Sequence, residues 1–509
     1  MITAKEVLSP AEEKFERWRK TVGFVLGPLC FLILYFLPIP TLSPQAHKLA
    51  AILSLVLVFW ISEAIPIPVT AILGAILSVL LGIAPAKDVF APFADPIVFL
   101  FIGSFIIAEA ITLHHLDKRF AFAIFSLRFI GENPYRVLFA CGAISAIISM
   151  WMSNTAATAM MLPITLGVLK AMDELHKEAG GTSPIMGSRY ATGMMLIIAY
   201  GASVGGIATP IGTPPNLIGI GFIQNLAGTK ITFFEWMLFA VPLTIVMFTF
   251  LYLIMRFLHP SPMVSLKGIK TYVANARGNL GRWNRGERNT AIAFLTAVFL
   301  WLFPSIISLI LGKDSPFSKF IGSRLDEGVV AVLAASLLFI LPVNWKERQF
   351  TMHWERAVRI DWGTILLFGG GLSLGKLMFF TGLAEVMGKG LTGITGASSL
   401  WGITAAGTLL AIIISETTSN TASANMVIPI MIAIAKGADV SPIPPALGAC
   451  LGASFGFMLP VSTPPNAIVY GSGVVPILKM LRAGIIFDII GFIIIVAGLM
   501  ILCPLMGWT

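Results

Sequence analysis

Charged residues are scarce in this sequence. Asp, Glu, Lys and Arg together make up 12% of 509 residues, whereas an ordinary soluble chain carries roughly 25%. So few charges cannot cover several water-exposed domains, which excludes a soluble enzyme, a nucleic-acid-binding protein and a disordered protein. Cysteine is also rare. The four cysteines lie in or beside apolar segments at unrelated spacings, so we expect small core residues and neither a disulfide framework nor a metal site.

Hydrophobic residues are abundant instead, at 57% of the chain. A membrane helix needs about 20 mostly apolar residues, and eleven segments of this chain meet that test. The first one follows a polar N-terminal stretch and has no cleavage site, so we interpret it as a retained span and not as a signal peptide. The predicted spans are 21–39, 47–63, 68–84, 96–113, 190–223, 232–258, 290–311, 326–342, 362–381, 443–475 and 480–505.

Two further apolar stretches, 136–172 and 399–435, are not typical of single membrane spans. Each is long and carries a polar cluster in its middle. This pattern predicts re-entrant helical hairpins, which enter the membrane and return on the same side. The sequence therefore predicts an all-α polytopic membrane protein with about eleven transmembrane helices and two hairpins.

The distribution of Lys and Arg predicts the orientation of the chain. With the N-terminus in the cytoplasm and eleven crossings, the cytoplasmic segments hold 25 of the 34 basic residues and the outer segments hold eight. The remaining one, Lys376, lies within a span. This arrangement makes 1–20 a cytoplasmic segment and 259–289 a basic cytoplasmic loop. The first hairpin then opens to the cytoplasm and the second to the outside.

The chain also contains an internal repeat. The sequence MSNTAATAMMLPI (152–164) recurs as TSNTASANMVIPI (418–430), and IGTPPNLI (211–218) recurs as VSTPPNAI (461–468). Under the predicted topology the two copies have opposite orientations. We therefore expect an inverted-repeat secondary transporter with halves at 21–258 and 290–509, and with its binding site at the midplane between the halves.

The repeated Ser-Asn-Thr triplet places hydroxyl and amide groups inside an apolar hairpin. Such groups are costly in hydrocarbon unless they find partners. They donate to a carboxylate and also offer oxygens to a hard cation. A hairpin tip also exposes the backbone N–H groups at the start of its second helix, where the helix dipole attracts anions. The triplets are therefore candidate sites for an anion.

The repeated Thr-Pro-Pro-Asn motif predicts a broken membrane helix, because two prolines remove backbone donors and clash with the preceding turn. The freed carbonyl and N–H groups are tolerated only inside the protein or beside a wet cavity, and transporters use such breaks to hold ions and substrate. Neither motif contains Arg, Lys or His. Positive potential must then come from helix termini and bound cations, which predicts cation coupling.

Paired Ser-Asn-Thr hairpins with paired Thr-Pro-Pro-Asn breaks resemble the divalent anion/sodium symporter family, the INDY-type di- and tricarboxylate transporters. The resemblance extends over roughly the whole chain. It implies a homodimer in which a transport domain moves against a scaffold domain as an elevator. It also implies symport of Na⁺ with a dicarboxylate of the succinate, malate and fumarate class across the inner or plasma membrane. Some members instead exchange dicarboxylates or citrate without net Na⁺ coupling, and the motifs leave that alternative open.

The resemblance also implies roles for individual residues. The substrate would contact Ser153, Asn154, Thr155, Ser419, Asn420 and Thr421, and the pocket would be closed by Thr213, Pro214, Thr463 and Pro464. A first Na⁺ site would use Ser149, Ser153, Asn154 and the Gly212 backbone, and a second would use Ser415, Thr418, Asn420 and the region of Ser462. No cofactor other than Na⁺ is expected.

The motifs also allow other interpretations. A hydrolase with Ser153 or Ser419 as nucleophile needs a nearby base, and all six histidines lie outside the hairpins, so we do not expect an enzyme. A channel framed by the two halves is a further alternative. The Ser-Asn-Thr clusters could also serve helix packing alone, and the Thr-Pro-Pro-Asn motifs could be ordinary loops.

Several charged residues near the membrane were also considered. Glu109 and Lys376 occupy nearly equivalent repeat positions, and we favour snorkelling or a structural pair over a coupling role. Glu416 precedes the second tip and either orients the hairpin or lies near the second cation. We interpret His114, His115 and Asp117 as interfacial residues and not as a metal site, because adjacent histidines do not share a helix face.

Overall fold

The computed structural model describes residues 10–127, 132–178, 185–262, 277–395 and 399–509, together with Ile130 and Ala274. Residues 1–9 of the predicted N-terminal segment and most of 263–276 in the predicted basic loop lie outside the described residues. The described chain is helical apart from loops and a short antiparallel hairpin of β1 (Pro342–Asn344) and β2 (Gln349–Phe350). The predicted all-α membrane fold is confirmed.

The helices of the two halves have the following bounds. The first half contains α1 (Pro10–Phe36), α2 (Pro44–Ser62), α3 (Ile67–Leu80), α4 (Ala86–Phe90), α5 (Pro96–Leu113), α6 (Leu116–Phe125), α7 (Pro134–Ser149), α8 (Asn154–Glu178), α9 (Arg189–Gly206), α10 (Pro214–Phe222) and α11 (Phe233–Leu258). The second half contains α13 (Arg285–Leu311), α14 (Pro316–Arg324), α15 (Glu327–Ile340), α16 (Trp354–Ala357), α17 (Trp362–Phe380), α18 (Leu383–Thr395), α19 (Leu400–Thr417), α20 (Asn420–Gly437), α21 (Ile443–Gly452), α22 (Pro464–Tyr470) and α23 (Ile477–Leu505).

Every predicted span corresponds to a helix or to a broken helix. Nine helices in the described part of the chain are long and apolar enough to cross a membrane, and these include the hairpin arms α8 and α19. Two predicted spans, 190–223 and 443–475, are each interrupted, which gives the pairs α9–α10 and α21–α22. Helical hairpins occur at both predicted positions, because α7 contacts α8 and α19 contacts α20 across short turns, and their re-entrant course stays a prediction.

The broken helices lie in the centre of the molecule. All residues of α9 from Tyr190 to Gly206 are buried, and so are all ten residues of α21. A helix that is apolar on every side belongs in a core. Backbone groups freed at the two breaks are therefore enclosed by protein, which is the setting that membrane proteins require for irregular backbone.

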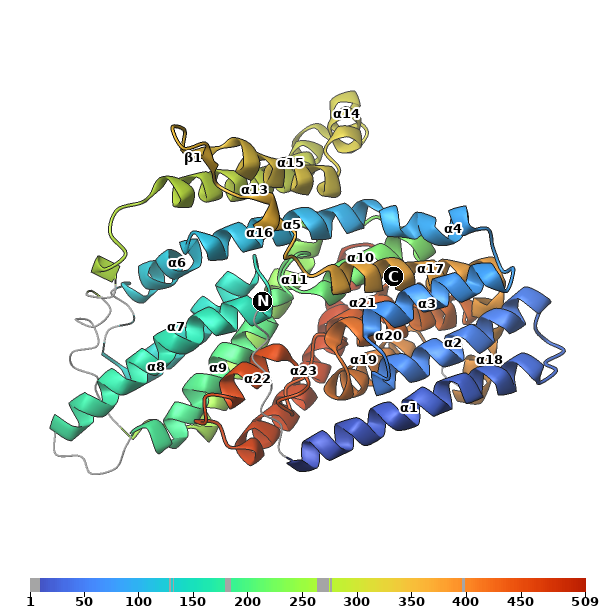
Figure 1. Cartoon of the computed structure of the whole chain (residues 1–509), viewed down its shortest axis with the longest axis horizontal. Helices are drawn as coiled ribbons and strands as arrows, with labels where there is room; N and C mark the ends of the chain where they lie inside the picture. Colours follow the sequence, from blue (N-terminus) through green and yellow to red (C-terminus); the bar gives the residue numbers. More distant parts are fainter. Residues whose placement is uncertain are drawn as a thin grey trace.

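The helices pack in two groups. In one group α5 packs on α15, α3 on α17, and α1 on α2; in the other α9 contacts α7, α8 and α11, and α21 contacts α19, α20 and α23. Figure 1 shows α13, α14 and α15 along one edge, the α7–α8 hairpin at the lower left, α1 and α2 at the lower right, and α22 and α23 between them. The groups meet where α17 contacts α20 and where α10 contacts α17.

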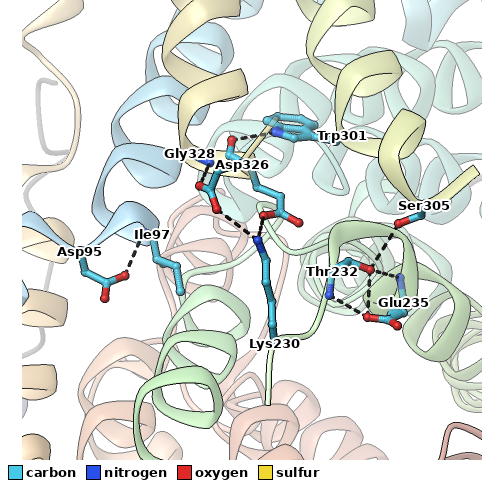
Figure 2. A network of polar contacts seen from close by, with 10 residues as sticks. Asp95, Ile97, Lys230, Thr232, Glu235, Trp301, Ser305, Asp326 and Gly328 are labelled. Carbon is cyan, nitrogen blue, oxygen red and sulfur yellow. Dashed lines mark hydrogen bonds and ion pairs between the residues drawn. The ribbon is translucent and has the colours of Figure 1, made fainter. Parts of the chain in front are cut away.

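Polar contacts also join the groups at one end of the bundle, as Figure 2 shows. Lys230, in the loop before α11, forms ion pairs of 3.1 Å with both Asp326 and Glu327 at the start of α15. Burial acts to lower the pKa of Lys230, but the two carboxylates outweigh it and raise that pKa. The same loop ends in a capping box, in which Thr232 and Glu235 bond to each other's backbone N–H groups and so fix the start of α11.

Several short helices are not predicted by the sequence pattern, and two of them occupy equivalent places in the halves. α6 follows α5, and α18 follows α17 at the equivalent repeat position. Both are too short to meet the length test of a membrane span. At the α5–α6 junction His114 Nε2 lies 2.7 Å from the carbonyl oxygen of Thr351, and Asp117 accepts from the Lys118 backbone N–H. Burial raises the pKa of Asp117.

Of the two interpretations of Glu109 and Lys376, snorkelling or a structural pair, the pair is not formed. Glu109 on α5 instead forms an ion pair of 2.5 Å with Arg356 on α16, and no ion pair of Lys376 occurs within the described residues. The reason lies in the inverted repeat, which places equivalent positions near opposite ends of the bundle. Glu109 lies near the end of α5 and Lys376 near the end of α17, and these helices run in opposite directions under the predicted topology.

Candidate functional site

The first hairpin tip lies between α7 and α8. Ser149, the last residue of α7, donates its hydroxyl hydrogen bond to Oδ1 of Asn154 at 2.7 Å. Ser153 Oγ accepts from the Ala156 backbone N–H at 3.2 Å, as an N-cap residue does. Ser153, Asn154 and Thr155 are half-buried. The tip is therefore held by its own side chains, while the three residues of the triplet keep part of their surface accessible.

The second hairpin tip repeats this geometry. Ser415 Oγ lies 2.8 Å from Asn420 Oδ1, and Ser419 Oγ accepts from the Ala422 backbone N–H at 3.2 Å. The residues of this triplet, including Thr421, are half-buried as well. Both tips thus place a serine–asparagine pair and a capped helix N-terminus in the same relation. The repeat seen in the sequence is a repeat of hydrogen bonds.

Each broken helix is held by the asparagine of its Thr-Pro-Pro-Asn motif. Nδ2 of Asn216 donates to the carbonyl oxygens of Gly206 and Thr209 at 2.9 and 2.8 Å. Nδ2 of Asn466 donates to those of Gly456 and Leu459 at 2.9 and 3.0 Å. Both side chains are fully buried. Carbonyl groups before each Thr-Pro-Pro-Asn motif are thereby given donors across the break.

Glycines allow the first break to approach the first tip closely. A Cβ added at Gly206 would lie 2.3 Å from Asn154 Oδ1, and one at Gly212 would lie 2.9 Å from the carbonyl oxygen of Ser149. Any side chain at these two positions would collide with the tip. The structure therefore brings together Ser149, Asn154 and Gly212, three members of the predicted first Na⁺ site.

The predicted second Na⁺ site is assembled in a similar way. A Cβ added at Gly456 would lie 3.3 Å from both the Ser415 carbonyl oxygen and the Ser462 side chain. Thr418 and Ser462 are both buried. The Thr418 hydroxyl donates to the Ile414 carbonyl oxygen, and the Ser462 hydroxyl donates to Glu416. Their oxygens keep lone pairs for a further partner. Within the part of the chain that is described, Oδ1 of Asn216 and of Asn466 has no donor.

The hairpin of each half packs against the break of the other half. α8 of the first hairpin contacts α22, and α20 of the second hairpin contacts α10. At the first break Cys450 of α21 lies with its Sγ 3.1 Å from the Pro215 carbonyl oxygen. Thr213 and Thr463 are buried N-caps of the half-helices, whereas Pro214 is half-buried and Pro464 is exposed. The half-helices that begin at the two Thr-Pro-Pro-Asn motifs thus interleave with the two hairpins.

Glu416 anchors the second tip. Its Oε1 accepts from the backbone N–H groups of Phe457 and Met458 at 2.6 and 3.0 Å, and its Oε2 accepts from Ser462 Oγ at 2.7 Å. These three donors belong to the second break, so the carboxylate fastens the hairpin to it. Of the two roles considered for Glu416, the orienting role is the one that these contacts describe.

A cationic residue near the second tip escaped the sequence analysis. Arg19 of α1 donates from Nη1 to the carbonyl oxygen of Thr417 at 3.1 Å, and it forms ion pairs with Glu16 and Glu63 at 2.9 and 3.5 Å. Two carboxylates balance this guanidinium, so it adds little net positive potential. The sequence offered no signal for this contact, because Arg19 belongs to the polar N-terminal stretch, nearly 400 residues before the hairpin.

Comparisons with known proteins cover nearly the whole chain. The family model described as sodium:sulfate symporter transmembrane region matches residues 19–508. The chain is 34% identical over 496 residues to the sodium-dependent dicarboxylate transporter SdcS of Staphylococcus saprophyticus, covering 97% of this chain and 93% of that protein. It is 32% identical over 489 residues to SdcS of Staphylococcus aureus strain MRSA252, covering 95% and 91%. In fold it resembles the Alcanivorax borkumensis YdaH transporter, with a TM-score of 0.55, 12% identity and coverage of 97% and 98%.

Proposed function

The chain belongs to the sodium:sulfate symporter family, and from that premise we propose that it is a secondary active transporter that carries dicarboxylates with Na⁺. The cargo is a C4 acid of the succinate, malate and fumarate class. Two relatives of similar length bear the name sodium-dependent dicarboxylate transporter, which supports both the cargo and the ion. We place the protein in the inner or plasma membrane with its N-terminus in the cytoplasm.

The observation that carries the proposal is the mirrored pair of serine–asparagine tips. Ser149 with Asn154, and Ser415 with Asn420, each combine hydroxyl and amide groups beside a capped helix N-terminus. Each carboxylate of the cargo takes donors from one tip, from Ser153 and Thr155 or from Ser419 and Thr421. A doubly negative acid of suitable length then satisfies both helix N-termini at once.

Sodium suits the oxygen groups beside the tips. Carbonyl, hydroxyl and amide oxygens are the ligands that hard cations prefer, and the glycines at 206 and 212 let the backbone of the first break approach Asn154 and Ser149 where a side chain would collide. Na⁺ on either side offsets the negative charge of the cargo and helps hold the tips in place. Each ligand then raises the affinity for the other by the same factor, which couples their transport.

The two packing groups support an elevator movement. Hairpins and broken helices lie together in one group, while α1–α3, α5, α15 and α17 form the other. We propose that the group of hairpins and broken helices carries the site across the membrane, while the other group stays fixed. We also propose that the protein is a homodimer, in which each chain consists of the inverted repeats 21–258 and 290–509. In this conformation the ion pairs of Lys230 and the hydrogen bond from Arg19 to Thr417 then join the moving group to the fixed group.

The test is uptake of radiolabelled succinate into proteoliposomes, with an inward gradient of Na⁺ or of choline. We expect uptake only with Na⁺, and loss of uptake in Asn154→Ala and in Asn420→Ala. Asn225→Ala is the matched control, because the amide of Asn225 bonds to Asp95 and Gly221, away from the tips. Wild-type uptake by either tip variant at matched amounts in the membrane would refute the site.

The same assay separates symport from exchange. Equal entry of succinate in choline, accelerated by internal succinate, 2-oxoglutarate or citrate, would replace the symporter by an exchanger. Saturation and counterflow with unlabelled acid distinguish either carrier from a channel.

A further inference from the structure

A cavity of about 370 Å³ lies between the two packing groups. Helices α2 and α17 form one side of it and α20 forms the other, while α18, which packs on α20, completes the wall. The volume falls within the range of about 300–1,000 Å³ that is typical of ligand pockets. Among the described residues that line the cavity there is no member of the predicted substrate or Na⁺ sites. This space is therefore separate from the proposed transport site.

The lining of the cavity is almost entirely apolar. Met378, Met387 and Met426 contribute flexible side chains from three different helices, and such side chains adapt to irregular ligands. None of the described residues that line the cavity is charged. The hydroxyl of Ser54, one of its few polar groups, donates within α2 to the Ala51 carbonyl oxygen at 2.7 Å. An anion would lose its hydration here without finding a partner, whereas an apolar group would not.

The cavity is long in the direction of α2. The residues of α2 that line it are Ala50, Leu53, Ser54, Leu57 and Trp60. Their spacing places them on one face of the helix, and ten residue steps of about 1.5 Å make this face about 15 Å long. The hydrocarbon core of a bilayer is about 30 Å thick, so the cavity matches the depth of a single leaflet.

The two ends of the cavity differ. The inner end is closed where α17 and α20 meet, because a Cβ added at Gly371 would collide with Oδ1 of Asn425. At the other end Thr41, in the loop after α1, and Val386 of α18 are exposed. Under the predicted topology this loop lies at the outer face of the membrane.

The open end is continuous with a surface that faces lipid. Ile33 and Phe36, which flank the lining residue Leu34 on α1, are 53% and 75% exposed. They belong to the predicted first span, so hydrocarbon and not water covers them. An apolar chain can therefore pass from the outer leaflet into the cavity without crossing a charged or hydrated region.

We propose that this cavity is a lipid-binding site, which takes one acyl chain of a phospholipid from the outer leaflet. The terminal methyl group lies near Gly371 and Asn425, and the ester end lies near Thr41. Transfer from bilayer to cavity exchanges one apolar environment for another, so the gain comes from packing. Wall atoms that face an empty cavity lack partners for dispersion contacts, and an apolar cavity of this kind stays dry and binds apolar molecules.

Photochemical labelling of the purified full-length protein tests the proposal. The protein is placed in vesicles of phosphatidylethanolamine and phosphatidylglycerol that contain a phosphatidylethanolamine with a diazirine at the end of one acyl chain. After irradiation, mass spectrometry locates the adducts. We expect adducts at Leu57 and Met378 in the cavity, and also at Leu295 and Phe299 of α13, which are exposed to lipid. Adducts on α13 without any in the cavity would overturn the proposal.

Variants that fill the cavity show whether the labelling depends on it. Ser54→Phe and Ala50→Phe each add a ring to the lining, so both should lose the cavity adducts and keep those on α13. Ile61→Phe is the matched control, because Ile61 is an exposed residue of the same helix, and it should keep both sets. Cavity adducts that persist at wild-type yield in both filling variants would refute the site. The labelling requires neither cargo nor Na⁺, so its failure would leave the proposed transport function unaffected.

Discussion

The asparagines that hold the breaks offer the sharpest test of how this structure binds ions. In Asn466→Ala the amide that donates to the Gly456 and Leu459 carbonyls is removed. The Gly456 carbonyl then loses its donor, at about 1–3 kcal/mol, whereas the Leu459 carbonyl still accepts from the Ser462 backbone N–H at 3.3 Å. The free energy of unfolding of a whole protein is only about 5–15 kcal/mol, so this loss should markedly destabilise the second break.

Part of that energy should appear as weaker binding of Na⁺, because the segment from Gly456 to Ser462 forms one wall of the second predicted ion site. A loss of about 1.4 kcal/mol at that site corresponds to a tenfold change in affinity. We therefore expect Asn466→Ala to need at least about tenfold more Na⁺ for half-maximal succinate uptake. Asn216→Ala should act similarly through the first break.

The assay is initial uptake against Na⁺ concentration at matched amounts of protein in the membrane. Asn225→Ala is again the control, since it also loses two amide hydrogen bonds but lies outside both breaks. If Asn466→Ala and Asn225→Ala showed the same dependence on Na⁺ as the wild type, the breaks would not shape the ion sites, and this reasoning would fail.

Three other outcomes follow from single contacts. Ser153→Ala and Ser188→Ala each remove an N-cap hydrogen bond, worth about 1 kcal/mol. Both variants should have a slightly lower unfolding temperature, but only Ser153→Ala should take up less succinate. Equal uptake by the two variants would argue against Ser153 as a donor to the substrate. Lys230→Met should weaken the contact between the packing groups. The raised pKa of Lys230 keeps its side chain charged up to strongly alkaline pH, and salt screens ion pairs. Added salt should therefore lower the unfolding temperature of the wild type but not that of the variant. Burial lowers the pKa of His259 from its ordinary 6.5 to about 4, so the folded protein holds this imidazole neutral. The free energy of unfolding should therefore be highest above pH 6.5 and should fall by about 3 kcal/mol as pH falls to 4. In thermal unfolding His259→Gln should lose less stability over this pH range than the wild type, and pH profiles of equal slope for the two proteins would contradict this.

Repeated motifs made much of the architecture predictable. The triplets at 153–155 and 419–421 fall at helix starts because a serine N-cap and a preceding turn are encoded locally. The breaks follow from consecutive prolines in the same way. Local rules of this kind predicted both hairpins and both interrupted helices from the sequence alone.

The features that were missed depend on contacts between distant segments. Asn216 and Asn466 were recognised as parts of a motif, but their partners are carbonyls whose exposure is decided by the path of the broken chain. Arg19 meets Thr417 only because α1 packs beside the second hairpin. Glu109 and Lys376 do not form a pair, because equivalent positions of an inverted repeat lie near opposite ends of the bundle.

The exchange of partners between the halves has a consequence for biosynthesis. The first hairpin is complete by residue 178, yet the half-helix that covers it, α22, begins only at Pro464. During translation the first tip can pack against its own break, at Gly206 and Gly212, soon after it is made, but its contact with α22 requires nearly 300 further residues. The packing between the two halves is therefore completed late in synthesis, and a chain that stops within the second half would lack this part of the surroundings of its first Ser-Asn-Thr.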